Sequence, residues 1–208
     1  MGHRTVLWTA LASVSLVVAR GAPAQEAVAD LYRQSYALEA RGDAEGSLKA
    51  MDAIAARGGA DYVVALRRGW LLYLAGRYAE SEPQYLQAIA KEPNALEPKL
   101  GVMLPLMAMR RWKEAQRYGS ELLKEAPGDS IVQGRMAYIH FMLGEYLEAE
   151  SRYRKVVAAY PSNVEMRVGL AWSLLRQRRV QEARAEFDRV LAFAPDHASA
   201  KEGRAQIP

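Results

Sequence analysis

Residues 144–161 read GEYLEAESRYRKVVAAYP, and this stretch decides the fold. It opens on Gly144 and closes on Pro161. Between them, Ala149 and Tyr153 stand four positions apart, which places them on the same face of a helix. Glycine favours the left-handed turn that ends a preceding helix, and proline cannot continue a following one. The stretch therefore predicts one amphipathic helix bounded by turn residues.

The same columns return every 34 residues along the chain. The proline column consists of Pro93, Pro127, Pro161 and Pro195. The turn column holds glycine or arginine, at Gly42, Gly76, Arg110, Gly144 and Arg178. A fixed period of this length is the signature of a repeat architecture. It divides the chain into five frames and a tail, which are residues 28–61, 62–95, 96–129, 130–163, 164–197 and 198–208.

Each frame predicts two helices joined by a tight turn. A 34-residue unit with a small residue, an aromatic residue four positions later and a final proline resembles the tetratricopeptide repeat. Ala149, Tyr153 and Pro161 carry this resemblance in the fourth frame. It implies an all-α, right-handed superhelical solenoid of five repeats, with residues 198–208 as a short capping helix. Frame three departs from the pattern, because Gly119 replaces the aromatic residue and a small residue of the first helix is replaced by Met103.

Residues 1–24 have the order of a secretory signal peptide. A basic start precedes an uncharged, mostly apolar run over residues 5–19, and small residues follow up to Ala24. We predict cleavage after Ala24 and a mature chain that begins at Gln25, in the periplasm or outside the cell. The apolar run is shorter than the roughly 20 residues that a membrane-spanning helix needs. The alternative is a signal that is retained as a membrane anchor.

The composition argues against most enzyme chemistry. The chain has no cysteine, which excludes thiolate metal sites and cysteine catalysis, and only three histidines. We therefore predict no catalytic residue, no metal and no cofactor. The net charge is +4, from 28 basic and 24 acidic residues, and loss of the signal peptide, with two arginines and no acid, lowers it to +2. Because so balanced a chain has no nucleic-acid footprint, we predict no nucleic-acid partner.

The first helices of the frames carry a stripe rich in aromatic residues. The family resemblance assigns these helices to the concave face, and the fifth, ninth and twelfth positions of a frame share one helical face. We predict that the stripe forms a groove for a protein or peptide partner. The ten candidate residues are Tyr32, Tyr36, Leu66, Trp70, Tyr73, Leu104, Met107, Tyr138, Phe141 and Trp172. In the alternative interpretation, a tight superhelix buries these side chains. Arg67 and Arg135 lie one residue beside the stripe in frames two and four.

A second group of residues is basic and clusters near the turns between paired helices. It consists of Arg110, Arg111, Lys113, Arg176, Arg178 and Arg179. In one interpretation these residues form an edge that contacts an anionic polysaccharide or another acidic partner. In the other interpretation they offset the dipoles at helix C-termini.

One histidine, His140, stands where the other frames have leucine. We predict that it is buried and hydrogen-bonded, and a pH sensor is the alternative. Together these features predict a non-enzymatic scaffold or adaptor of the cell envelope that recognises its partner by surface contact. The alternatives are a carbohydrate-binding envelope factor, as in polysaccharide export, and self-association through the terminal repeats.

Overall fold

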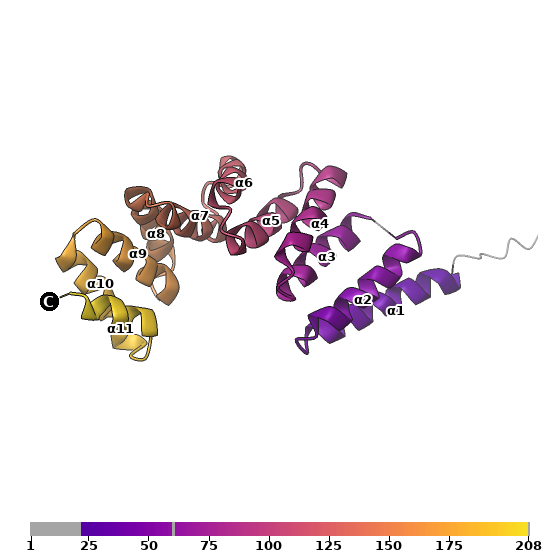
Figure 1. Ribbon diagram of the computed structural model, residues 1–208, viewed down its shortest axis with the longest axis horizontal. Coiled ribbons are helices and arrows are strands. Elements are labelled where there is room, and N and C mark those ends of the chain that lie inside the picture. The colour runs from indigo at the N-terminus through magenta and orange to yellow at the C-terminus, as the bar shows by residue number, and fades with distance from the viewer. Residues whose placement is uncertain (1–21, 60, 208) are drawn as a thin grey trace, which may run out of the picture.

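The computed structural model describes residues 22–59 and 61–207, which form eleven α-helices and no strand. The helices are α1 (Ala22–Glu39), α2 (Ala44–Ala56), α3 (Tyr62–Leu74), α4 (Tyr78–Lys91), α5 (Leu96–Ala108), α6 (Trp112–Glu125), α7 (Ser130–Met142), α8 (Tyr146–Ala159), α9 (Val164–Arg176), α10 (Val180–Phe193) and α11 (Ala198–Ala205). Figure 1 shows them stacked in pairs along an arch, with α6 on its outer side and α5 and α7 towards its hollow. The structure confirms the predicted all-α solenoid of five helical pairs and a short final helix.

The boundaries of the helices follow from local sequence signals. Four first helices begin at the first residue of a predicted frame, at Tyr62, Leu96, Ser130 and Val164. The side chains that precede three of them accept a hydrogen bond from a backbone N–H of the first turn, at Asp61, Asp129 and Asn163. Between paired helices the chain passes through a left-handed residue, at Gly42, Gly76, Arg110, Gly144 and Arg178. Because this conformation costs a non-glycine residue about 1–2 kcal/mol, the stacked helices must impose it on the two arginines.

Buried aromatic rings set the distance between neighbouring repeats. Tyr85, Tyr153 and Phe187, on α4, α8 and α10, are buried. Each ring packs on a glycine of the following helix, at Gly101, Gly169 and Gly203. A Cβ atom at these three positions would lie 2.1–2.3 Å from a ring atom. Only glycine therefore lets the ring close the interface.

The interface between the third and fourth repeats is built in the opposite way. Gly119 on α6 supplies no ring, and Met136 and the buried Met103 occupy the space beside it. Two methionines therefore fill the volume that an aromatic side chain fills in the other interfaces. This explains why frame three has Gly119 in place of the aromatic residue and Met103 in place of the small residue. Since no ring presses on α7, the position that is glycine in α5, α9 and α11 carries a long side chain there, Arg135.

The predicted signal peptide lies outside the described residues, except for residues 22–24, which begin α1. Its cleavage after Ala24 therefore stays a prediction. Within the described residues, no helix combines the length and the apolar character that a bilayer-crossing segment requires.

Candidate functional site: the concave groove

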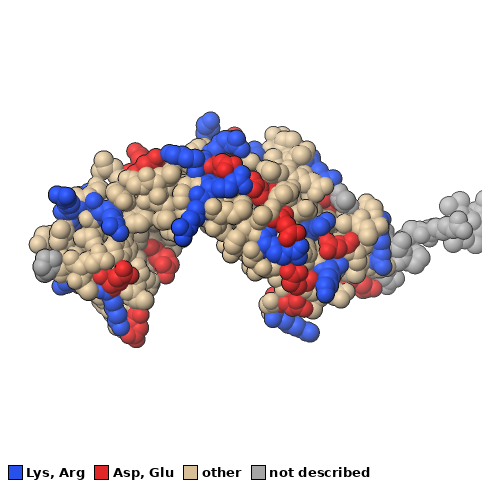
Figure 2. Space-filling model, viewed as in Figure 1, with Lys and Arg blue, Asp and Glu red and all other residues tan. Residues whose placement is uncertain are grey.

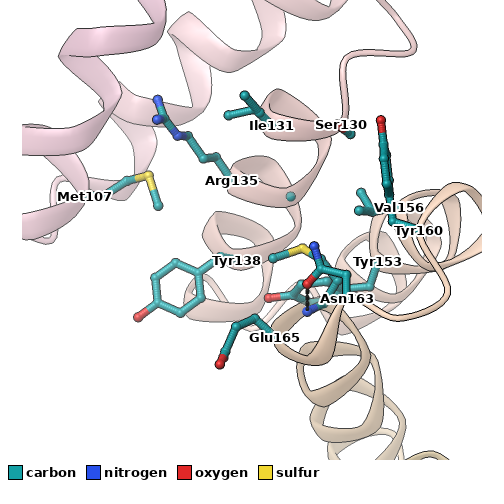
Figure 3. A pocket seen from close by; sticks show the side chains of 12 residues that line it. Met107, Ser130, Ile131, Arg135, Tyr138, Tyr153, Val156, Tyr160, Asn163 and Glu165 are labelled. Carbon is teal, nitrogen blue, oxygen red and sulfur yellow. Dashed lines mark hydrogen bonds between the residues drawn. The ribbon is translucent and has the colours of Figure 1, made fainter. Parts of the chain in front are cut away.

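Two cavities open on the face of the repeats that carries the predicted stripe, and they share part of their lining. The first has a volume of about 560 Å³ and lies between α5, α7, α8 and the start of α9. The second has a volume of about 390 Å³ and lies between α7, α8, α9 and α11. Tyr138, Tyr153 and Glu165 line both, so the two cavities form one continuous groove. Figure 2 shows the hollow beneath the arch, and Figure 3 shows the first cavity.

Two glycines open this groove. At the fifth position of the frames, the other repeats carry a large side chain, whereas frame four carries Gly134, which lines the first cavity. Gly169 lines the second cavity, and the buried ring of Tyr153 packs directly behind it. Because neither residue has a side chain, the second helix α8 contributes Tyr153 to both cavities.

Four of the ten predicted groove residues line these cavities: Met107, Tyr138, Phe141 and Trp172. Tyr138 is 43% exposed, and its ring meets Trp112 edge-on, with the centroids 5.8 Å apart. Trp172 donates a hydrogen bond from Nε1 to Ser199 Oγ at 2.9 Å, and its ring meets Phe187 edge-on. Rings that are held in this way present a preorganised apolar surface to a ligand.

The N-terminal part of the stripe is occupied by the protein's own contacts. Trp70 donates from Nε1 to Glu39 at 2.6 Å. Arg67 donates to the same carboxylate and to Ser35 Oγ, both at 2.8 Å. Its guanidinium also lies 3.7 Å from the centroid of the Tyr36 ring. These contacts pair the charge of Arg67 and the indole N–H of Trp70 inside the protein.

The remaining predicted groove residues also contact the protein itself. Tyr73 stacks on Trp70, with the centroids 5.8 Å apart. The side chains of three others are half-buried: Tyr32, Leu66 and Leu104. Apart from Tyr36, which is 53% exposed, the N-terminal part of the stripe matches the interpretation in which the aromatic side chains pack internally, whereas the C-terminal part borders open space.

Sequence reasoning missed several residues that line the first cavity, among them Ser130, Ile131, Tyr160, Glu165 and Met166. Tyr160 ends a second helix, and Ile131 and Glu165 lie in first turns, so the stripe did not include them. The signal that locates them is the glycine at the fifth position of frame four, since a missing side chain exposes its neighbours.

Arg135 is the cationic residue of the first cavity, and Figure 3 shows it directed towards Met107. One of its guanidinium N–H groups donates to the backbone carbonyl of Leu100 on α5. Desolvation by burial lowers the pKa of Arg135 from its ordinary value, and the nearby hydroxyl groups of Tyr85 and Tyr73, followed by the carboxylate of Asp129, oppose this shift more weakly. Arg135 forms no ion pair with any residue that the structure describes.

Cations and carboxylates are interleaved along the predicted basic edge. Three of its six cations are neutralised by the protein's own carboxylates: Arg111 by Glu82 and Glu114, Lys113 by Glu145, and Arg179 by Glu150 and Glu182. Arg110, Arg176 and Arg178 are exposed. Because cations and carboxylates alternate along these turns, the six residues do not form a continuous basic surface. The face in Figure 2 shows the same mixture of charges.

His140 is buried and hydrogen-bonded, as predicted. Its Nδ1 lies 2.6 Å from Glu145 Oε2, and Lys113 binds the same carboxylate. Hydrogen bonds from Lys113 and His140 hold the pKa of Glu145 below its usual range. Across the described ranges, no group of three or more potential metal ligands is close enough to hold a metal ion.

The stacked helical pairs define an α-solenoid, a fold whose curvature creates an extended concave surface. A family model described as tetratricopeptide repeat matches residues 32–95, 106–164 and 135–198, which is more than half of the chain. The chain therefore belongs to the tetratricopeptide repeat family. Proteins of this family are typically scaffolds without an enzymatic activity of their own.

Solved structures show the same fold at low sequence identity. MamA from Desulfovibrio magneticus RS-1 is 16% identical, with a TM-score of 0.75 over 83% of this chain and 98% of MamA. A tetratricopeptide repeat protein from Parabacteroides merdae is 18% identical, with a TM-score of 0.76 over 88% of this chain and 72% of its own. YrrB, described as having an unusual peptide-binding site, is 14% identical, with a TM-score of 0.71 over 84% and 90% of the two chains. No curated protein matches the chain in sequence.

Proposed function

We propose that the protein is a non-enzymatic adaptor of the cell envelope that binds a segment of a partner protein in the continuous groove between α5 and α11. The carrying observation is the exposed apolar lining of the groove, where Ile131 is 55% exposed, Tyr160 51% and Tyr138 43%. Exposed apolar side chains gathered around a cavity mark a contact surface. The structural likeness to YrrB, which has a peptide-binding site, supports a peptide segment as the ligand.

The test fills the groove without removing any of its contacts. Gly134→Leu gives frame four the residue that frames two and three carry at this position, and its added Cβ meets only the flexible Met166 Sδ, at 2.9 Å. Twelve-residue random peptides displayed on phage, selected on the full chain, serve as probes. We expect Gly134→Leu to weaken the selected peptides at least tenfold, since lost contacts at anchor residues cost about 2 kcal/mol.

The matched control is Ser120→Leu, which adds the same side chain at an exposed position of α6. It should leave peptide affinity unchanged, and circular dichroism should show both variants folded. Equal binding by wild type and Gly134→Leu would place the binding surface elsewhere and overturn the proposal.

The envelope location rests on the predicted signal at residues 1–24. N-terminal sequencing of the protein recovered from a bacterial periplasmic fraction should begin at Gln25. A chain that retains Met1 in the membrane fraction would support the anchored alternative instead. No observation favours an anionic polysaccharide as the partner, because carboxylates neutralise half of the basic edge.

A further inference from the structure

Arg67 and Arg135 occupy the same position in the second and fourth repeats, 68 residues apart. In both places the preceding second helix lacks the aromatic ring that forces glycine at this position in the third and fifth repeats and in α11, because Met51 and Gly119 stand in the ring column. An arginine side chain therefore enters the interface between repeats at both places. The two guanidinium groups, however, meet different surroundings.

Arg67 has three partners, and all of them come from α1. It donates to Ser35 Oγ and to Glu39, and it lies over the ring of Tyr36. With a side chain only 11% exposed, Arg67 is a largely buried cation whose charge is matched inside the protein. This is the usual state of a buried charge, since an unpaired one is costly.

Arg135 has lost every one of these partners. The residues of α5 that correspond to Ser35, Tyr36 and Glu39 are Met103, Leu104 and Met107, and none carries a charge or a hydroxyl group. What Arg135 retains is a hydrogen bond to the carbonyl of Leu100. Arg135 also lines the open first cavity, so a ligand in that cavity can reach the guanidinium.

We propose that Arg135 binds the carboxylate of an aspartate or glutamate side chain in the partner segment. This inference rests on the proposed function and specifies its ligand. A guanidinium binds a carboxylate through two parallel hydrogen bonds, and such charged bonds strengthen where water is displaced. The apolar neighbours Met107, Ile131 and Tyr138 favour an apolar or aromatic residue beside the acidic one.

The charges of the groove also orient this residue. Glu165 lines the groove on the other side of Tyr138, as Figure 3 shows, and it lies 3.1 Å from His197 Nε2. The second cavity also contains Glu202 and one cation, Arg176. Because two carboxylates outnumber this cation, a further carboxylate is disfavoured there and the acidic side chain is directed to the Arg135 end. A side chain fits better than a chain terminus, because the groove continues from the first cavity into the second and does not end at Arg135.

The test uses the same twelve-residue peptides, fused to the phage coat at their C-terminus so that no terminal carboxylate is free. We expect peptides selected on the full chain to be enriched in aspartate or glutamate next to an aromatic residue. Replacing that acid by its amide in the synthetic peptide should weaken binding about 10- to 100-fold on wild type and have little effect on Arg135→Met.

Met107→Glu provides an independent test in which Arg135 is kept. The introduced carboxylate stands where Glu39 stands relative to Arg67, and it should bind the guanidinium and abolish the preference for acidic peptides. The matched control, Met107→Gln, should retain the preference. Circular dichroism checks that each variant is folded.

The outcomes separate the two proposals. Peptides that bind wild type and fail on Gly134→Leu, but show no acidic preference, would overturn the role of Arg135 and leave the groove intact. A preference that persists on Arg135→Met would do the same. If only synthetic peptides with a free terminal carboxylate bind, the ligand of Arg135 is the C-terminus of the partner and not an acidic side chain, and the proposal is overturned. If the selected peptides bind Gly134→Leu as well as wild type, the groove itself and this inference both fail.

Discussion

The two ends of the concave face use the same repeat positions for opposite purposes. Near the N-terminus, Arg67, Glu39 and Trp70 form a closed set of hydrogen bonds that leaves no charge unmatched. In the fourth repeat, the corresponding Arg135 donates to the backbone carbonyl of Leu100 and lines an open cavity together with Met107. The difference shows that a repeat position has no fixed role, since its role depends on the residues that the preceding repeat places against it.

Removing the carboxylate of Glu39, which pairs with Arg67, should produce the largest change in stability at the N-terminal end. Glu39→Ala leaves the largely buried Arg67 without its ion pair and Trp70 Nε1 without its acceptor. We expect a loss of about 3 kcal/mol in the free energy of unfolding, because an unpaired buried charge and a lost hydrogen bond both contribute. Urea denaturation followed by circular dichroism measures it.

Arg135→Met provides the matched comparison at the other end. Since Arg135 has no ion pair to lose, the variant should stay within about 0.5 kcal/mol of wild type or gain stability. Similar large losses for both variants would mean that Arg135 has an internal partner, and the contrast between the two ends would disappear.

Acid should weaken the groove-bearing end through a carboxylate on α8. Glu150, with a side chain only 9% exposed, binds Arg154 and Arg179. Burial alone would raise the pKa of Glu150, but hydrogen bonds from Gln177, Arg154 and Arg179 outweigh it and hold the pKa below its ordinary value. A lowered pKa in the folded state stabilises the protein at a pH above the unfolded value, near 4.5, and this contribution is lost as the pH falls further.

We therefore expect Glu150→Gln to cost about 1–2 kcal/mol at pH 7 and progressively less below pH 4.5. Amide hydrogen exchange, measured at pH 7 and below pH 4.5, locates the loss of stability. The loss should concentrate in α8–α10 and spare α3. An equal loss in α3 would show that the repeats unfold as one unit rather than through separate neighbour contacts.

The sequence predicts the fold of this protein more completely than its groove. Gly144 and Pro161 mark the ends of helices regardless of what surrounds them, so the 34-residue period was enough to place the helical pairs. The state of the stripe depends on contacts between repeats. Trp70 and Trp172 occupy the same column, yet Trp70 donates to a carboxylate of α1 whereas Trp172 donates to Ser199 of the final helix beside the second cavity.

The same limit explains the basic edge. Arg111 and Arg179 follow the turns, and the sequence near these turns shows only a cluster of cations. Their carboxylate partners Glu82 and Glu150 stand about 30 residues earlier in the chain and come into reach only when consecutive repeats stack. Spacing within a repeat identifies helical faces, whereas partners across repeats depend on the angle at which the pairs stack.

Building the missing carboxylate should have a small effect on stability and is the most direct test of the equivalence between the two ends. Arg135 is already desolvated in wild type, so Met107→Glu adds an ion-pair partner and pays only for burying its own carboxylate. We expect the free energy of unfolding to rise by about 0.5–1 kcal/mol and the gain to shrink at high salt, because Met107 borders an open cavity. Met107→Gln, which has nearly the same shape and no charge, should show neither the gain nor its salt dependence. A loss of stability specific to Met107→Glu would mean that the guanidinium of Arg135 is not placed relative to α5 as the guanidinium of Arg67 is placed relative to α1. The two arginines would then differ in geometry as well as in their partners.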